Sequence, residues 1–168
     1  MLIISSLASA HAAFDRYGPA RVISLMTNES DMPSFPELEA DNHLKLVVAP
    51  KNCDLSAKDG AMGRAKEILE FLNAWDREGN ILVHCELGVS RSTATGFVSL
   101  CLLNPDASEE ELLTELRGAA PHADPCPAIV SCADDLLDRD GRMLDALLDL
   151  PPPSPSPSDS IICLPTPL

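Results

Sequence analysis

The stretch that decides the fold of this chain reads His84-Cys85-Glu86-Leu87-Gly88-Val89-Ser90-Arg91-Ser92. The apolar run 81–83 precedes it, and the helix-compatible run 92–103 follows it. This order predicts a buried strand, a tight loop and a helix, an arrangement that binds anions through loop amides and a helix N-terminus. The stretch therefore indicates a phosphate-binding loop with a cysteine at its base.

The side chains of this loop suit attack on a phosphate ester. Cys85 is the candidate nucleophile, because a helix N-terminus and a nearby cation favour the thiolate. Arg91 carries a planar set of donors that can bind two phosphoryl oxygens. The Ser92 hydroxyl is placed to hydrogen-bond the sulfur, and we expect His84 to support the loop rather than to move protons.

The backbone of the same loop is the predicted phosphate cradle. Gly88 has no Cβ, so the chain can turn sharply and approach a ligand closely. We expect the side chain of Glu86 to point outward while its amide faces the phosphate. The predicted phosphate-binding residues are Glu86, Leu87, Gly88, Val89, Ser90 and Arg91.

The string His-Cys-x5-Arg-Ser resembles the signature loop of the cysteine-dependent protein tyrosine phosphatase superfamily. Residues 83–92 are most similar to the dual-specificity and small bacterial members, and the resemblance covers most of residues 1–150. It implies in-line attack by Cys85 on a phosphate ester, a cysteinyl-phosphate intermediate and hydrolysis by water. It also implies that no metal and no cofactor takes part.

The resemblance further implies an upstream aspartate that protonates the leaving oxygen as a general acid. Asp54 lies 31 positions before Cys85, which resembles the dual-specificity spacing, and Asp59 is the second candidate. Small bacterial relatives often carry the acid directly after the third strand, where this chain has Ala49 and Pro50. Asp54 is equally suited to an Asx-turn or a helix N-cap.

Three functions are compatible with these residues. The first is hydrolysis of phosphate monoesters, with protein phosphotyrosine as the main substrate class and phosphoserine or phosphothreonine in addition. The second is a non-catalytic phosphate-binding pseudophosphatase module, which has the cradle without a competent acid. The third is sulfur transfer or thiol redox chemistry at Cys85, against which the Arg91-Ser92 pair argues.

The net charge and the spacing of the cysteines limit the partners and the cellular compartment that we expect. The 168-residue chain has a formal net charge of −14, so neither nucleic acid nor an anionic membrane is expected as a partner. The expected partner is a phosphorylated protein or a small phosphate ester. The six cysteines form no compact disulfide pattern or C-x-x-C motif, which predicts a cytoplasmic protein without a zinc site. Cys53 is either an incidental loop residue or a disulfide partner for Cys85.

Apolar periodicity predicts an α/β fold. Strands are expected near 2–5, 21–26, 44–48 and 81–83, and helices near 8–17, 60–76, 93–103, 108–116, 128–137 and 141–150. They would form a mostly parallel central sheet of about four to five strands, flanked by helices on both faces, with the Cys-x5-Arg loop between strand and helix. We expect a phosphatase-like domain over 1–150 and a Pro/Ser-rich tail over 151–168. Residues 161–164 are apolar enough to dock on the domain or to remain unused.

Overall fold

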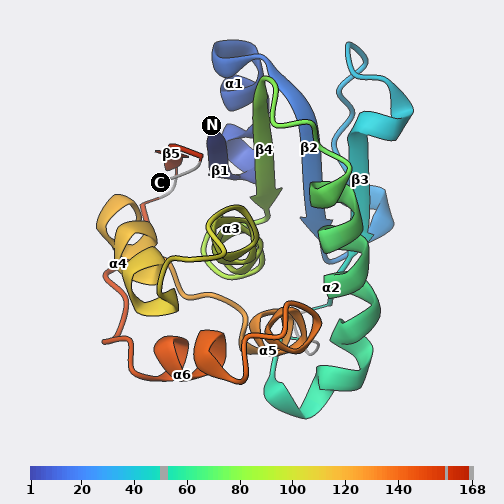
Figure 1. The fold of residues 1–168 in the computed structure, drawn as a ribbon. Helices are drawn as coiled ribbons and strands as arrows, with labels where there is room; N and C mark the ends of the chain where they lie inside the picture. The colour runs from blue at the N-terminus through green and yellow to red at the C-terminus, as the bar shows by residue number, and fades with distance from the viewer. Residues whose placement is uncertain (50–52, 158, 167–168) are drawn as a thin grey trace.

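The computed structural model describes residues 1–49, 53–157 and 159–166. In this part of the chain, five strands form one sheet in the order β3-β2-β4-β1-β5 (Figure 1). Four of them run parallel, and β5 is antiparallel to its neighbour β1. The prediction of a mostly parallel sheet is therefore confirmed. The strands are β1 (Leu2–Ser6), β2 (Pro19–Met26), β3 (His43–Val47), β4 (Asn80–Cys85) and β5 (Ile161–Leu164).

Helices connect the strands and cover both faces of the sheet, as the sequence predicts. The α-helices are α1 (Leu7–Tyr17), α2 (Lys58–Asn73), α3 (Arg91–Leu103), α4 (Glu109–Ala119), α5 (Pro127–Leu136) and α6 (Arg142–Leu148). Short 3-10 turns are η1 (Glu29–Asp31), η2 (Ala40–Asn42) and η4 (Leu55–Ala57). The segment 28–42 thus contains two of these turns. No helix within the described residues is long and apolar enough to cross a membrane.

Side-chain alternation along the strands divides the core into two layers. Ile3, Val22 and Leu82 pack with α1 and Phe35 on one face. Their neighbours along the strands, among them Ile4, Ile23 and Val83, pack with the larger helical layer on the other. Because both faces are covered, these strands read as continuous apolar runs in the sequence.

The helix that follows the signature loop is buried almost entirely. All residues of α3 except Leu102 are buried. It contacts β1 and β4 on one side and α4 and α5 on the other (Figure 1). At Gly96 the approach is so close that a Cβ would lie 2.4 Å from the Ile4 Cδ1 atom. The part of α3 around Gly96 therefore packs directly against the Ile4 side chain of β1.

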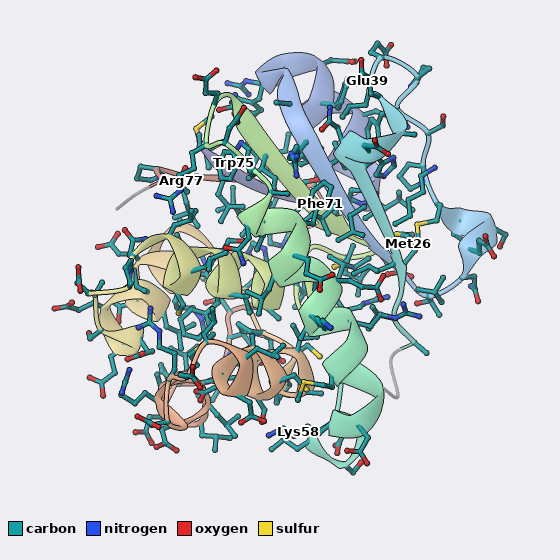
Figure 2. All side chains as sticks on the ribbon, turned by 45° about the vertical axis from the view of Figure 1, so that its right-hand side comes forward. Met26, Glu39, Lys58, Phe71, Trp75 and Arg77 are labelled. Carbon is teal, nitrogen blue, oxygen red and sulfur yellow. The ribbon has the colours of Figure 1, made fainter. Side chains whose placement is uncertain are left out.

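A long helix, α2, borders the sheet beside β3. Figure 2 shows Lys58 at one end of α2 and Phe71 near the other end, beside the strands. There the Arg21 guanidinium lies 4.8 Å from the centre of the Phe71 ring and donates to the Phe71 carbonyl at 2.9 Å. At the other end Lys58 pairs with Asp135 of α5 at 2.7 Å. Each end of α2 is thus attached to a different layer.

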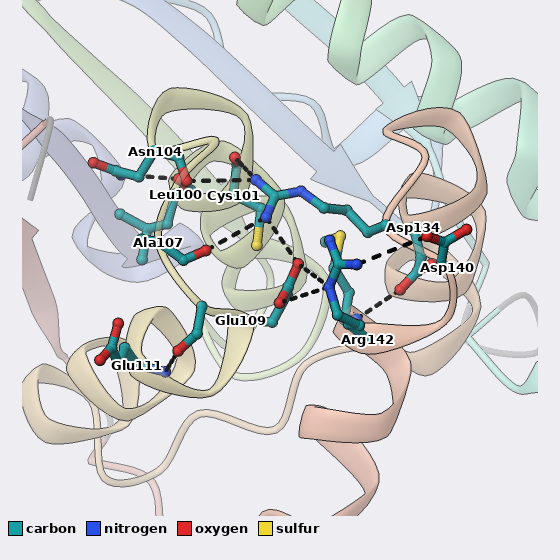
Figure 3. Close-up of polar contacts among 12 residues, drawn as sticks. Leu100, Cys101, Asn104, Ala107, Glu109, Glu111, Asp134, Asp140 and Arg142 are labelled. Carbon is teal, nitrogen blue, oxygen red and sulfur yellow. Dashed lines mark hydrogen bonds and ion pairs between the residues drawn. The ribbon is translucent and has the colours of Figure 1, made fainter.

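A buried polar network joins α3 to the three helices that follow it in the chain (Figure 3). The Arg139 guanidinium donates to Glu109 Oε1 at 2.8 Å and to the Cys101 carbonyl at 2.6 Å. Both side chains of the ion pair are less than a tenth exposed. Asp134 accepts from the amides of Gly141 and Met143, which caps the N-terminus of α6. The network connects α3, α4, α5 and α6 through charge-assisted hydrogen bonds.

The C-terminal segment docks on the domain, which is one of the two alternatives that the sequence allows. The Arg117 guanidinium donates to the Pro151 carbonyl at 2.8 Å, and the Ser154 amide donates to the Pro121 carbonyl at 2.9 Å. The chain then reaches β1, where Ile162 pairs with Ile4 and the buried Leu164 pairs with Leu2. The sheet therefore gains its antiparallel edge strand from residues 161–164.

Candidate active site

The candidate nucleophile ends the central strand of the sheet. Cys85 is the last residue of β4, and its register partners are Ser6 of β1 and Leu25 of β2. The carboxyl ends of parallel strands are where ligands bind in such sheets. The Cys85 Sγ atom lies 3.1 Å from the Ser92 Oγ atom on the first turn of α3. The predicted proximity of thiol and hydroxyl is therefore present in the structure.

The loop after Cys85 is shaped by a glycine that no other residue could replace without strain. Gly88 has a φ of +72°, and a Cβ there would lie 2.8 Å from the Ser6 backbone nitrogen. A positive φ is costly for residues that have a Cβ. Since the nearest atoms belong to the backbone of β1, they cannot move aside easily. Gly88 thus allows the loop to lie directly on the end of β1.

Three carbonyl groups of the loop accept hydrogen bonds from amides outside it. The Leu7 amide donates to the Glu86 carbonyl at 3.2 Å, and the Asp124 amide donates to the Val89 carbonyl at 2.9 Å. The Ser90 carbonyl accepts from the amides of Cys126 at 3.2 Å and Ala94 at 2.9 Å. By contrast, the amides of residues 87–90 donate to no acceptor within the described chain. Neighbouring segments thus hold the loop through its carbonyl groups, while the amides of residues 87–90 remain available to an anion.

Arg91 is fixed by acceptors from the ends of two other strands. Its Nη1 donates to the Val48 carbonyl at 3.0 Å and to the Thr27 Oγ1 atom at 3.2 Å. Its Nη2 pairs with the Glu86 carboxylate, and only 11% of the side chain is exposed. The guanidinium has five N–H donors. The Nε–H and one Nη2–H have no acceptor among the described residues, so two donors are available for phosphoryl oxygens.

The Glu86 side chain corrects one expectation from the sequence. It folds inward instead of pointing outward, and its carboxylate also accepts a hydrogen bond from the Thr27 amide. Burial raises the pKa of this carboxyl, but the Thr27 hydrogen bonds and the Arg91 charge outweigh burial and hold the pKa below its usual value. The Glu86 carboxylate therefore pairs with the Arg91 guanidinium and accepts a hydrogen bond from the Thr27 amide, which follows β2.

His84 is fully buried and neutral. Its Nε2 atom lies 2.6 Å from the Ser24 hydroxyl, which in turn lies 2.7 Å from His43 Nε2. Burial, with smaller contributions from the charges of His43 and His11, lowers the pKa of His84 to about 4. The hydrogen bonds link β4 to β2 and β3 through side chains, and its Nδ1 has no described partner. His84 thus supports the strand end, and its role in supporting the loop itself stays a prediction.

The structure gives Asp54 a local role at the start of a helical turn. Its side chain is exposed and accepts a hydrogen bond from the Ser56 amide at 2.8 Å as the N-cap of η4. The Ser56 hydrogen bonds hold the pKa of this carboxyl below its usual value. The N-cap alternative is therefore present, and a general-acid role for Asp54 stays a prediction. Asp59 lies exposed in the first turn of α2, and residues 50–52 lie outside the described residues.

Sequence reasoning identified the loop but missed its partners. Thr27 and Val48 directly follow β2 and β3. The sequence feature that could have identified them as partners of the loop is their position at the end of an apolar strand. The segment around Asp124 borders the loop through backbone contacts.

His122 is buried and is hydrogen-bonded to Ser160 at 3.2 Å, so it faces the C-terminal segment. No cluster of three or more potential metal ligands occurs among the described residues.

Searches with the sequence found no matching family model and no matching curated protein. Comparison with solved structures does find neighbours. The dual-specificity phosphatase DUSP15 aligns with a TM-score of 0.60 over 89% of this chain and 92% of its own, at 19% identity. The chain has the fold of the cysteine-dependent protein tyrosine phosphatases. The resemblance seen in residues 83–92 is thereby confirmed at the level of the fold.

Two further solved structures share this fold. The PTP-2 phosphatase of Cydia pomonella aligns with a TM-score of 0.56 at 16% identity, covering 80% of this chain and 84% of that one. The human tyrosine phosphatase-like serine/threonine/tyrosine-interacting protein aligns with a TM-score of 0.57 at 17% identity, covering 83% and 92%. At such identities the likeness concerns the fold, and function has to be argued from the site.

Proposed function

We propose that this chain hydrolyses phosphate monoesters, with protein phosphotyrosine as the main substrate class and phosphoserine or phosphothreonine as further substrates. The observation that carries the proposal is the combination of Cys85 and Arg91 around one loop. The thiol lies at the base of amides that lack protein acceptors, and the guanidinium keeps two donors available beside it. These groups match a nucleophile and a binding site for a phosphoryl group.

The proposed reaction has two displacement steps at phosphorus. The Cys85 thiolate attacks in line, so that a sulfur–phosphorus bond forms while the bond to the leaving oxygen breaks. An acid, assigned to Asp54 with Asp59 as the alternative, protonates that oxygen. Water then attacks the cysteinyl-phosphate and gives its proton to the carboxylate formed in the first step, so that inorganic phosphate is released. The sulfur departs as thiolate while Ser92, 3.1 Å away, donates to it.

An apolar side chain on the loop supports the choice of an aryl phosphate. Leu87 is 71% exposed, although it belongs to the segment that would surround the phosphate. An exposed leucine there offers contact area to the ring of a phosphotyrosine, which a phosphorylated serine lacks. We expect Leu87→Asp to raise KM for an aryl phosphate more than it lowers kcat.

The test is hydrolysis of an aryl phosphate by the wild type and by Cys85→Ser. The wild type should turn over, and the variant should be inactive yet retain phosphate binding, because the loop amides and Arg91 remain. Cys163→Ser is a matched control, since it removes a half-buried thiol from β5. Trapping of a phosphorylated Cys85 after acid quench identifies the intermediate. Equal, background-level rates for wild type and Cys85→Ser would rule out the hydrolysis.

The engagement of Asp54 as a helix cap favours a second candidate, a phosphate-binding module without catalysis. Asp54→Asn and Asp59→Asn distinguish the two functions when substrates with good and poor leaving groups are compared. Loss of the acid should slow the poor leaving group about 10²–10⁴-fold and the good one far less. A chain that binds phosphate but hydrolyses neither substrate is a binding module.

A further inference from the structure

Two cysteines that the proposed hydrolysis does not use lie together beside the cradle. The Cys126 thiol is within 3.5 Å of the Cys53 carbonyl oxygen, to which it donates. The Ala128 amide donates to the same oxygen at 3.3 Å. Although 73 positions separate the two residues in sequence, the Cys126 thiol is thus held against the backbone of Cys53.

The remaining cysteines have other surroundings. Cys85 contacts Ser92, Cys132 donates to the Lys58 carbonyl at 3.3 Å, and Cys163 is half-buried on β5. Cys101 is buried inside α3. Cys126 differs from these cysteines, because its thiol lies against the backbone of another cysteine, Cys53.

The two thiols differ in the properties that decide thiol reactivity. Cys53 is half-buried, whereas Cys126 is fully buried at the N-cap of α5. The neighbouring Cys126 side chain and, more weakly, the Arg91 charge outweigh burial and lower the pKa of Cys53 to about 7. The Cys53 side chain, together with burial, raises the pKa of Cys126. Near neutral pH, Cys53 is thus the accessible thiolate and Cys126 keeps its proton.

We propose that Cys53 and Cys126 form an oxidation-sensitive dithiol, which hydroperoxides convert to a Cys53–Cys126 disulfide without use of the catalytic thiol. The Cys53 thiolate attacks a peroxide oxygen, the oxygen–oxygen bond breaks, and Cys53 becomes a sulfenic acid as hydroxide leaves. Cys126 then attacks the sulfenic sulfur, and its proton leaves with the sulfenic oxygen as water. Two thiols lose two electrons, and hydrogen peroxide is reduced to water.

The disulfide would connect two segments that border the active site. Cys53 precedes the N-cap residue Asp54, and the Cys126 amide holds the Ser90 carbonyl of the phosphate loop. This pairing differs from a Cys53–Cys85 disulfide, which would consume the nucleophile. The proposed dithiol does not depend on phosphatase activity, so it can be tested in a chain that lacks Cys85.

The experiment uses the full chain carrying Cys85→Ser, reduced and then exposed to hydrogen peroxide. Free thiols are alkylated, and the non-reduced digest is analysed by mass spectrometry. We expect a peptide pair joined through Cys53 and Cys126, a loss of two free thiols per chain, and full reversal by dithiothreitol. Adding Cys53→Ser should abolish the cross-link, whereas adding the matched control Cys163→Ser should leave it unchanged. Cys53 recovered as an unlinked sulfinic acid, as an intact thiol or joined to another cysteine would overturn the proposal.

A second measurement needs no substitution at the buried Cys126. In the Cys85→Ser chain, alkylation by iodoacetamide is followed separately at Cys53 and Cys163 between about pH 6 and pH 9. Cys53 should react faster at neutral pH, and its rate should reach half its maximum near pH 7. If both half-buried thiols react equally slowly at neutral pH, the dithiol lacks the reactive thiolate that the proposal requires.

Discussion

Replacement of Gly88 by alanine tests whether the phosphate loop depends on a close approach to β1. The added Cβ would lie 2.8 Å from the Ser6 nitrogen and 3.0 Å from the Ser5 carbonyl carbon. Both atoms belong to the backbone of a strand that is paired on both edges, so they cannot shift without disturbing the sheet. The residue also keeps a φ of +72°.

The cost can be separated into two contributions. A left-handed conformation costs a residue with a Cβ about 1–2 kcal/mol. Forcing an extra methyl group into closely packed surroundings costs a further ~1–3 kcal/mol. Gly88→Ala should therefore lower the free energy of unfolding by about 2–5 kcal/mol. It should also lower kcat/KM for an aryl phosphate, because the loop must move away from Ser6.

Two other glycines supply matched controls for the two contributions. Gly18 has a φ of +52°, but a Cβ there meets nothing within 4 Å, so Gly18→Ala should show the conformational cost alone. Gly118 lies in α4 with open space around it, so Gly118→Ala should stabilise the protein by about 0.5–1 kcal/mol.

The assay is urea unfolding of all three variants, with midpoints and m-values compared, together with steady-state kinetics. Gly88→Ala should lose clearly more stability than Gly18→Ala, and it alone should lose activity. If Gly88→Ala is no less stable than Gly18→Ala and hydrolyses the substrate normally, the loop is not held by this contact and the steric reasoning is wrong.

Three further predictions concern charged and titratable groups. Burial lowers the pKa of His84 to about 4. Below pH ~6.5, this histidine is therefore protonated in the unfolded chain while it stays neutral in the folded protein. Stability should therefore decrease from pH ~6.5 to about 4, by up to roughly 3 kcal/mol, and His84→Gln should flatten this decrease in urea titrations. Glu109→Gln should cost about 3–5 kcal/mol in thermal or urea unfolding, because it leaves the buried Arg139 charge without its counter-ion; an unchanged midpoint would contradict this. Glu86→Gln removes the negative charge that faces Arg91, so vanadate should bind tighter by a factor of about five, corresponding to ~1 kcal/mol for a partly exposed ion pair; weaker binding would show that the carboxylate mainly orients the guanidinium.

Much of the secondary structure follows from local patterns in the sequence. Ser108 caps α4 by accepting from the Glu111 amide, as the spacing of the two residues predicts. Gly18 ends α1 in a left-handed conformation, as expected for a helix C-cap. The boundaries moved by a few residues, for example at α2, which ends at Asn73 while the predicted helix continues to 76. Such features depend on neighbouring residues, which a sequence displays directly.

The orientation of the Glu86 side chain was harder to predict, because the residues around it are compatible with both an outward and an inward orientation. A carboxylate beside a phosphate cradle would repel the substrate, so an outward side chain is the natural expectation. The structure instead offers it the Arg91 guanidinium and the Thr27 amide, and charge-assisted hydrogen bonds compensate for its partial burial. Thr27 lies 59 positions earlier in the chain, so the sequence around the loop contains no sign of this partner.

The sequence by itself determined the loop with Cys85 and Arg91, because that chemistry depends on residue types at fixed spacing after an apolar strand. It also determined the parallel α/β architecture, because strands and helices bury their faces with different periods. The tertiary structure alone decided which acceptors hold Arg91, where Glu86 points and that Cys53 meets Cys126. These contacts join segments far apart in the chain, and they depend on the strand order β3-β2-β4-β1-β5 and on how the helices pack over it. Periodicity reveals which face of an element is buried, but not which distant element covers it.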